Sequence, residues 1–430
     1  GTMDGTDLSY LGVEGVSYDD PVFGIPQADR RQHLYTIGRT GSGKTTLLRN
    51  LIIQDIEAGR GLALIDPHGD LAADILEHIP SWRTDQVIVF DPSDLERPLG
   101  LNVLAHVPVD QRPLVADNVV AIFRHLWGLD ETATPRLLRL LFSCVSALLD
   151  FPPDPGATLL GVPRMLVDER YRARVVRHIQ NPKVRSFFTD ELPQWDKRYL
   201  ADATAALGNV IETFLTSPVL RNIFGQPKSS FSMRRLIDDG GILIVSLSKG
   251  KLGEQTSNII GSFVVSGLQA AAMSRADTPE EERRDFHLFV DEFQSFATTS
   301  FASLLSEARK YRLCLTLAHQ YTDQISPTIL SAVLGNCGTL IAFRVGASDA
   351  ERLAPEFAPY PATTLQELSR GEVIVRLMRY GRPVEPFMGT TLPPLDAHKG
   401  QRENVLHQSR ERYGRERRTV EGKIGRWLRH

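Results

Sequence analysis

The stretch TIGRTGSGKTTLL, residues 36–48, fits the pattern G-x-x-x-x-G-K-[ST] of a loop that wraps around nucleotide phosphates. Its glycines let backbone N–H groups come close to the phosphates, and the N-terminus of the next helix attracts their charge. We expect Lys44 to contact the β- and γ-phosphates of ATP and Thr45 to bind Mg²⁺. The residues expected to surround the nucleotide are Gly38, Arg39, Thr40, Gly41, Ser42, Gly43, Lys44, Thr45 and Thr46.

The flanks of this loop supply the strand and the helix that the pattern requires. The apolar run HLYTI (33–37) precedes it, and a helical pattern with one apolar face follows over residues 44–58. Short apolar runs of the same kind recur in the rest of this first block, at residues 62–66 and 87–91, and in a second block, at residues 241–247, 286–290, 313–317, 339–343 and 373–378. Such strands, separated by helices, predict an α/β fold with a largely parallel sheet covered on both faces.

The segment between the two blocks has a different pattern. Residues 105–235 contain long amphipathic stretches such as RPLVADNVVAIFRHLW and PRLLRLLFSCVSALL, and no convincing strand. We therefore expect an all-α domain inserted into one α/β domain. The boundaries we predict are 1–20 for a tag and N-terminal extension, 21–104 and 236–395 for the two parts of the α/β domain, 105–235 for the insertion, and 396–430 for a basic C-terminal tail.

The composition is that of an ordinary soluble protein. The 430 residues are 42% hydrophobic and 23% charged, with a net charge of −3, so nucleic-acid binding cannot be argued from bulk charge. The three cysteines, Cys144, Cys314 and Cys337, lie in apolar segments without zinc-binding spacing, which predicts buried free thiols and a cytoplasmic location. The uncharged run 255–274 contains several polar residues, so we expect a core helix rather than a membrane span.

The two ends of the chain carry separate expectations. The opening Gly-Thr-Met is typical of a cloning remnant. One alternative is therefore that a natural N-terminal segment, such as a membrane anchor, was removed. The tail 396–430 holds ten Lys and Arg against five Asp and Glu. We interpret it as a mobile basic tail, and a tail that binds DNA or acidic lipid is the alternative.

An acidic pair ends the apolar strand in FHLFVDEF. Asp291 is expected to hold the Mg²⁺ shell, and Glu292 to orient and deprotonate the attacking water. A solvated pair at a strand end is the simple alternative for such a motif alone, but the phosphate-binding loop upstream favours the catalytic interpretation.

Further candidates follow from neighbouring strand ends. Gln320 ends LCLTLAHQ and is expected to sense the γ-phosphate, whereas His319 beside it is expected to be structural. Arg309 in SEARKYR is the favoured arginine to reach a neighbouring subunit's γ-phosphate, ahead of Arg312 and Arg344. Asp66 and Asp70 are expected mainly to cap helices. His68 is not expected to bind a metal, because no second ligand has the right spacing.

Five stretches together resemble the FtsK/HerA superfamily of DNA-pumping ATPases, and within it the type IV secretion coupling proteins of the TraG/TraD kind. They are HLYTIGRTGSGKTTLLRNLI, ALIDPHGDLA, LFVDEFQSFATTSFASLLSEARKYRLCLTLAHQ, TLIAFRVGASDAERL and RGEVIVRLMRYGRPVEPFMGTTLPP. The likeness covers residues 20–395. It implies a RecA-like motor interrupted by an all-α domain, with Gln320 at the family's motif-three position and Arg309 as the finger supplied in trans.

The resemblance also implies partners. The family forms hexameric rings around DNA, and the all-α domain of coupling proteins meets the relaxosome or secreted substrates. Candidate DNA contacts in the ring are Lys249 and Lys251 in SLSKGKLGE, and the basic run 170–185, although each is more often a solvated charged surface.

Four functions stay open from the sequence. The leading one is an ATP-driven DNA translocase of the coupling-protein type, the cytosolic portion of an inner-membrane protein. Because the usual N-terminal membrane helices are missing here, a soluble HerA-like translocase in repair is an alternative. A coupling ATPase that recruits protein effectors and a nucleotide-dependent scaffold are the others, and the catalytic Glu292 argues against the scaffold.

Overall fold

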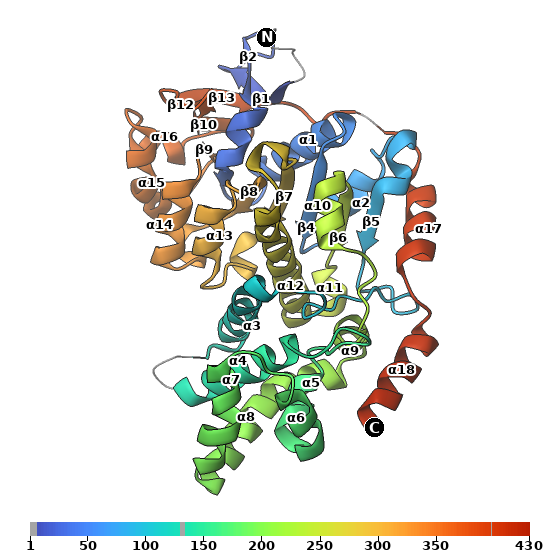
Figure 1. Ribbon diagram of the computed structural model, residues 1–430. Coiled ribbons are helices and arrows are strands. Elements are labelled where there is room, and N and C mark those ends of the chain that lie inside the picture. The colour runs from blue at the N-terminus through green and yellow to red at the C-terminus, as the bar shows by residue number, and fades with distance from the viewer. Residues whose placement is uncertain (1–6, 130–133, 397) are drawn as a thin grey trace.

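The computed structural model describes residues 7–129, 134–396 and 398–430, and the Gly-Thr-Met that we expected to be a cloning remnant lies outside them (Figure 1). Its strands are β1 (Leu8–Glu14), β2 (Val22–Pro26), β3 (Leu34–Ile37), β4 (Gly61–Asp66), β5 (Val87–Phe90), β6 (Ile242–Ser246), β7 (Phe286–Asp291), β8 (Leu313–His319), β9 (Thr339–Ala342), β10 (Glu372–Arg376), β11 (Met378–Arg379), β12 (Arg382–Pro383) and β13 (Phe387–Thr391).

The helices alternate with these strands and also fill the region between β5 and β6. They are α1 (Lys44–Glu57), α2 (Asp70–Leu76), α3 (Arg112–Trp127), α4 (Pro135–Leu149), α5 (Gly161–Val167), α6 (Glu169–Val176), α7 (Pro182–Ser186), α8 (Lys197–Thr216), α9 (Pro218–Phe224), α10 (Met233–Asp239), α11 (Lys249–Leu252), α12 (Glu254–Met273), α13 (Phe301–Glu307), α14 (Pro327–Asn336), α15 (Ala347–Leu353), α16 (Ala362–Gln366), α17 (Arg402–Tyr413) and α18 (Arg417–Arg429).

One eleven-stranded sheet forms the centre of the molecule, in the order β2-β1-β13-β10-β9-β3-β8-β7-β4-β6-β5. The strands from β9 to β5 run parallel, and the four at the other end pair antiparallel. The α/β fold with a largely parallel sheet is therefore confirmed. Because the carboxyl ends of the parallel strands meet at one edge, the loops that follow β3, β8, β7, β4 and β6 are neighbours there.

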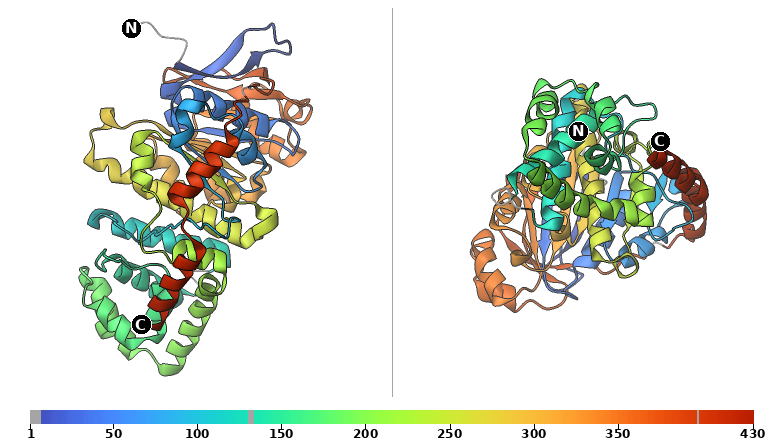
Figure 2. Two further views of the ribbon diagram at one scale, coloured as in Figure 1. Left: turned by 90° about the vertical axis from the view of Figure 1, so that its right-hand side faces the viewer. Right: turned by 90° about the horizontal axis from the view of Figure 1, so that it is seen from below.

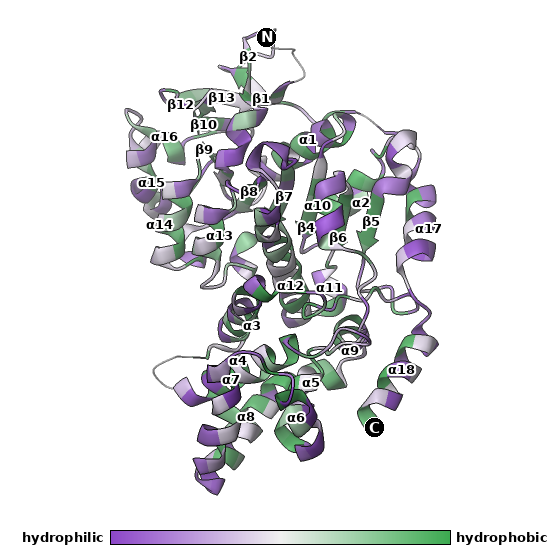
Figure 3. Ribbon diagram, viewed as in Figure 1, coloured by the Kyte–Doolittle hydropathy of each residue, from purple (hydrophilic) through white to green (hydrophobic). Residues whose placement is uncertain are grey.

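Alternate residues of the central strands face two separate apolar layers. On β4, Leu62 and Leu64 pack with α1 and α2, whereas Ala63 and Ile65 belong to the core that includes α12 and α13. All six residues of β4 are buried. The hydropathy colouring shows green strands between helices whose outward residues are purple (Figure 3). Burial on both faces explains why these strands are continuous apolar runs rather than alternating ones.

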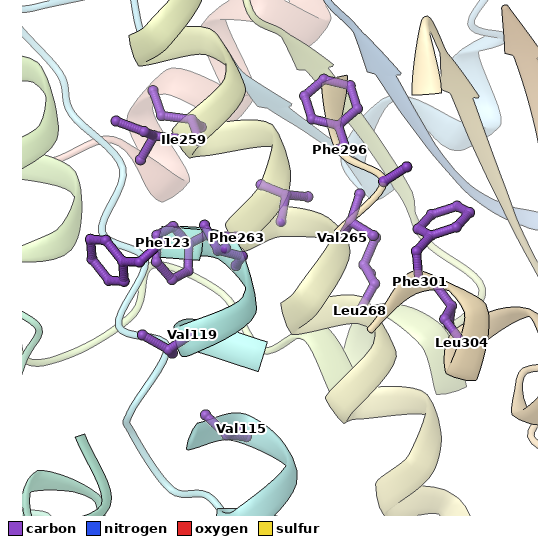
Figure 4. Packing of buried hydrophobic residues seen from close by; sticks show 14 of the residues in the cluster. Val115, Val119, Phe123, Ile259, Phe263, Val265, Leu268, Phe296, Phe301 and Leu304 are labelled. Carbon is purple, nitrogen blue, oxygen red and sulfur yellow. The ribbon is translucent and has the colours of Figure 1, made fainter. Parts of the chain in front are cut away.

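Helices α3–α9 form a separate layer at one end of the sheet, as the views in Figures 1 and 2 show. The long helix α12 packs between this layer and the segment after β7: Phe263 faces Phe123 of α3, and the ring of Phe296 lies against Gly261 (Figure 4). Helix α12 is long and apolar enough to cross a membrane, but it is mostly buried in the protein. This burial agrees with the expected core helix.

The two ends of the chain differ from what we expected. Strand β1 lies within the predicted N-terminal extension, yet it pairs with β13 and β2 inside the sheet. The C-terminal tail forms α17 and α18 instead of a mobile segment, and Val405, Val420 and Ile424 are buried. Pattern reasoning missed these helices because each has only a few apolar anchors among many charges.

The tail helices fasten the two layers together. The side chain of Ser409 on α17 accepts a hydrogen bond from the backbone N–H of Val89, so α17 covers the outer edge of β5. On α18, Trp427 packs edge-on against Tyr171 of α6, and the guanidinium of Arg164 lies over its ring. The basic tail is thus part of the folded body.

Candidate nucleotide-binding site

The phosphate-binding loop runs from the end of β3 to the start of α1. Its first amides are held by neighbouring strand ends, since Gly38 N–H donates to His319 O and Arg39 N–H donates to Arg344 O at 3.0 Å. Gly43 has a φ of 121°, which only glycine adopts without strain. A Cβ on Gly38 would lie 2.6 Å from the Cβ of Phe343, so this wall admits no side chain.

The loop carries polar groups without a partner in the part of the chain that the structure describes. The first N–H groups of α1, which begins at Lys44, have no carbonyl one turn earlier to accept them. The buried hydroxyl of Ser42 also has no hydrogen-bond partner among the described residues. Donors that converge on one concave backbone fit a phosphate group.

The side chain of Lys44 is folded back over the loop. Its Nζ donates to the carbonyl oxygens of Gly38 and Arg39, and the residue is only 9% exposed. Burial lowers the pKa of Lys44, and the charges of Asp291 and Glu292 oppose that effect. The structure therefore brings the loop lysine and the acidic pair together, although β3 and β7 are separated by β8.

Two carboxylates crowd each other at adjacent strand ends. Burial raises the pKa of Asp291 to about 6, and the negative charges of Asp66 and Glu292 add to the shift. Asp66 is 1% exposed and accepts the backbone N–H groups of Ala72, at 2.9 Å, and His68, at 3.1 Å. Asp66 thus caps α2, as expected, and also faces Asp291.

This crowding fits a divalent cation beside the phosphates. Asp291 is a half-buried carboxylate at the end of β7, and the hydroxyl of Thr45 stands in the first turn of α1. The described parts of the chain contain no group of three or more His, Cys, Asp or Glu side chains that could hold a metal ion. Mg²⁺ fits such a set, because it usually takes one or two protein ligands and completes its shell with phosphate oxygens and water.

Glu292 contacts a residue to which the sequence assigned no role. Its Oε1 lies 2.9 Å from Nε2 of His68, in the loop after β4. This hydrogen bond raises the pKa of His68. Glu292 itself has a φ of 49°, which is uncommon for a non-glycine residue. The signal that could have found this pair is the adjacency of β4 and β7, which the motifs alone do not reveal.

Gln320 is placed between the loop and the acidic pair. It follows β8, which lies between β3 and β7, and it is half-buried. Its backbone N–H donates to Oε1 of Gln324 at 3.1 Å. His319, the preceding residue, is buried and its ring nitrogen bonds the hydroxyl of Tyr35 at 2.5 Å, in agreement with a structural role.

Arg309 lies far from this site. It is exposed in the turn after α13, before the amino end of β8. The seven residues of β8 span about 20 Å, so Arg309 and Gln320 stand at opposite edges of the sheet. Arg312 lies 3.8 Å from Asp285 and is mostly buried, whereas Arg344 is exposed next to the phosphate-binding loop. The site of one chain therefore includes Arg344 but not Arg309.

The candidate DNA contacts also differ in position. Lys249 and Lys251 belong to α11, directly after β6, at the same edge of the sheet as the nucleotide site. The basic run 170–185 lies on α6 and α7 in the helical layer. Within this run, Arg172 donates to the carbonyl oxygens of Met165 and Leu166, so part of its charge serves local structure.

The same fold occurs in solved ATPases of secretion and conjugation systems. The bacterial conjugative coupling protein TrwBdeltaN70 matches with a TM-score of 0.65 and 16% identity over 92% of this chain and 91% of that chain. Plasmid coupling protein TrwB in complex with the GTP analogue GDPNP matches with a TM-score of 0.64 and 17% identity over 92% of each chain.

A second kind of ATPase also matches. VirB4 of Thermoanaerobacter pseudethanolicus matches with a TM-score of 0.60 and 13% identity over 91% of this chain and 98% of that chain. No family model and no curated protein matches the chain. At these identities the likeness establishes the fold alone, and it confirms the P-loop ATPase fold that the sequence resemblance implied.

Proposed function

We propose that this protein is an FtsK/HerA-type ATPase that works as a ring motor on DNA, of the kind that couples DNA to type IV secretion. The observation that carries the proposal is the convergence of the loop lysine, the acidic pair and Gln320 at one edge of the sheet. TrwB, which shares the fold, has been solved with ADP and Mg²⁺ and with the ATP analogue ADPNP. ATP and Mg²⁺ are accordingly the ligands we assign to this site.

The residues divide the work of phosphoryl transfer to water. Backbone N–H groups of the loop and Lys44 hold the phosphates, and Thr45 and Asp291 hold the Mg²⁺ ion. When bound, Mg²⁺ neutralises charge that develops on the phosphate oxygens. Glu292 orients the attacking water and accepts its proton, and Gln320 reports the presence of the γ-phosphate to β8.

The position of Arg309 supports assembly into a ring. A cation that neutralises the leaving phosphate has to touch it, and in one chain Arg309 is at the wrong edge of the sheet. A second copy that placed its amino edge against the nucleotide would supply the missing charge. Six copies in a closed ring satisfy this need at every site, as the sequence resemblance implies.

The test compares ATP hydrolysis with and without DNA. Wild-type protein should hydrolyse ATP faster when duplex or single-stranded DNA is added, and Lys44→Ala should remove both rates. Motor activity should appear as displacement of a third strand from a triplex, in an ATP-dependent manner. If DNA leaves the ATPase rate unchanged and no third strand is displaced, the proposed DNA cargo is wrong.

A second candidate function moves or docks protein effectors. The observation in its favour is that none of the site residues comes from α3–α9, so this layer is free for recognition. In this case the layer would bind a secreted or relaxosome protein, and DNA would not stimulate hydrolysis. Stimulation of wild-type ATPase by a candidate effector, in the absence of DNA, distinguishes the two.

A further inference from the structure

Three loops at the carboxyl edge of the sheet are tied to one another by hydrogen bonds. Strands β7, β4 and β6 are consecutive neighbours, and the loops after them carry the acidic pair, His68 and α11. The backbone N–H of Lys249 donates to the carbonyl oxygen of Pro67 at 2.8 Å. His68, the next residue, bonds Glu292 at 2.9 Å. An unbroken path of contacts therefore leads from α11 to the proposed base.

The hydrogen bond with His68 turns the carboxylate of Glu292 toward the loop after β4. Strand β4 lies on one side of β7, and β3 with its phosphate-binding loop lies on the other side, beyond β8. Neighbouring strands are about 4.8 Å apart, so the loop after β3 is about 10 Å from β7 across the sheet. A carboxylate bonded toward β4 is directed to the wrong side for a water at the γ-phosphate.

The segment around α11 combines uncommon backbone conformations with two lysines. Ser248 has a φ of 44°, an uncommon conformation for serine, and Gly250 and Gly253 have no atoms near the place of a Cβ. Lys249 has one acidic neighbour, the exposed Glu254, at 3.7 Å, which is a weak surface pair. Lys251 is exposed. Two lysines on one short segment suit the phosphate backbone of DNA.

We propose that His68 is a positioning residue that holds Glu292 in a resting place until DNA phosphates bind Lys249 and Lys251. Binding at α11 shifts the loop, the Lys249–Pro67 hydrogen bond transmits the shift to His68, and Glu292 is released toward the nucleotide. This inference rests on the proposed DNA-dependent ATPase, and it adds the route by which DNA controls the rate.

The first test measures the DNA-free ATPase rate of His68→Ala in the full chain. The rate should rise roughly fivefold to tenfold, the population change that one hydrogen bond to a charged group supports, and added DNA should then change it little. His68→Gln keeps a donor and should restore the low rate. A His68→Ala protein with a normal melting temperature and an unchanged or lower DNA-free rate overturns the proposal.

The second test asks whether α11 acts through His68. Lys251→Glu should lose most of the stimulation by DNA, whereas Lys228→Glu, the same charge reversal at an exposed lysine in the loop after α9, should keep it. The double variant His68→Ala/Lys251→Glu should retain the high DNA-free rate of His68→Ala. If the double variant returns to the wild-type rate, the relay is wrong.

The two proposals fail in different ways. If DNA does not stimulate wild-type hydrolysis, the DNA proposal fails and with it the role of α11. The DNA-free rate of His68→Ala still reports whether the histidine restrains Glu292. An elevated rate in that variant without DNA stimulation of the wild type would keep the restraint and reject DNA as its release.

Discussion

The two edges of the parallel sheet treat buried charge in opposite ways. At the amino edge, Asp55 lies between Arg30 at 2.5 Å and Arg60 at 2.7 Å. At the carboxyl edge, Asp291 faces the carboxylates of Asp66 and Glu292. Burial alone would raise the pKa of both aspartates. Arg30 and Arg60 instead lower the pKa of Asp55, while the pKa of Asp291 rises to about 6.

The difference shows what each edge is for. A buried carboxylate with two guanidinium partners is satisfied in the folded chain and contributes to its stability as it stands. A buried carboxylate among others of the same sign stores unfavourable energy, which a bound cation relieves. Charge pairing thus separates the structural edge from the functional edge more clearly than residue type does.

The largest expected effect comes from the residue that would connect the two edges. Arg309→Ala should lower the ATPase rate by about 10³-fold, the range found for arginine fingers, without a change in nucleotide binding. Arg309→Ala mixed with Lys44→Ala should regain part of the activity, because some sites receive an intact loop from one chain and an intact arginine from the other. Absence of recovery at every ratio, in rings shown by native mass spectrometry to be mixed, contradicts the trans role.

The next effect isolates the functional edge. Glu292→Gln should reduce ATP hydrolysis by about 10²–10⁴-fold, because a neutral amide cannot accept the proton of the attacking water. Its free energy of unfolding should stay close to that of the wild type, since the one ion pair of this carboxylate among the described residues is with the half-exposed His68. Glu282→Gln, at an exposed position, serves as the control. Normal hydrolysis in Glu292→Gln would remove the catalytic assignment.

The structural edge should respond in the reverse sense. Asp55→Asn should lower the free energy of unfolding by about 3–5 kcal/mol, because it leaves two guanidinium groups without their buried counter-charge. The ATPase rate per folded molecule should remain within a factor of about two, since Asp55 is remote from the loop. Urea unfolding, with Asp239→Asn as an exposed control, measures the difference. A stable but inactive Asp55→Asn would break the comparison.

The smallest effect concerns a buried histidine at the amino edge. The Nδ1 of His33 accepts the N–H of Leu315, and its Nε2 bonds the carbonyl oxygen of Leu305. Burial lowers the pKa of His33 to about 4, so the unfolded chain takes up a proton below pH 6.5 that the native state refuses until pH 4. As the pH decreases from 6.5 to 4, the contribution of His33 should therefore lower the free energy of unfolding by about 1.4 kcal/mol per pH unit.

His33→Asn sharpens that prediction. Asparagine tolerates the φ of 68° at this position, so the backbone is retained while the titrating group is lost. The slope of unfolding free energy against pH should decrease by about one proton in the variant. His407→Asn, at an exposed position on α17, is the matched control. An unchanged slope in His33→Asn would show that His33 is not held neutral.

Much of the fold was predictable because the sequence motifs and the spacing of apolar residues are both local signals. The loop pattern with Lys44, the apolar runs and the acidic pair each occupy a few consecutive residues, and they predicted the parallel sheet and the order of its parts. The helical layer followed from the period of its apolar residues. The strands at β1 and β2 and the helices of the tail were missed, because their burial depends on partners far away in sequence.

The candidate site was only partly predictable for the same reason. Asp291 and Gln320 lie at strand ends and Lys44 begins α1, and the structure brings these three residues to one edge of the sheet, while their roles stay predictions. The contact between His68 and Glu292 joins loops more than two hundred residues apart, so no spacing rule reveals it. Arg309 is close to the acidic pair in sequence, but it precedes the amino end of β8 and therefore lies at the opposite edge of the sheet. Its position could be predicted only from the direction of β8.

The strand order has a consequence for how the protein is made. Strand β3, which leads into the phosphate-binding loop, pairs with β8 on one side and β9 on the other, and these begin at Leu313 and Thr339. At ribosomal rates of about 5–20 residues per second, β3 waits roughly 15–60 s for its first neighbours. During that interval the apolar strand has two open edges, a state that favours aggregation of the nascent chain until most of it has been translated.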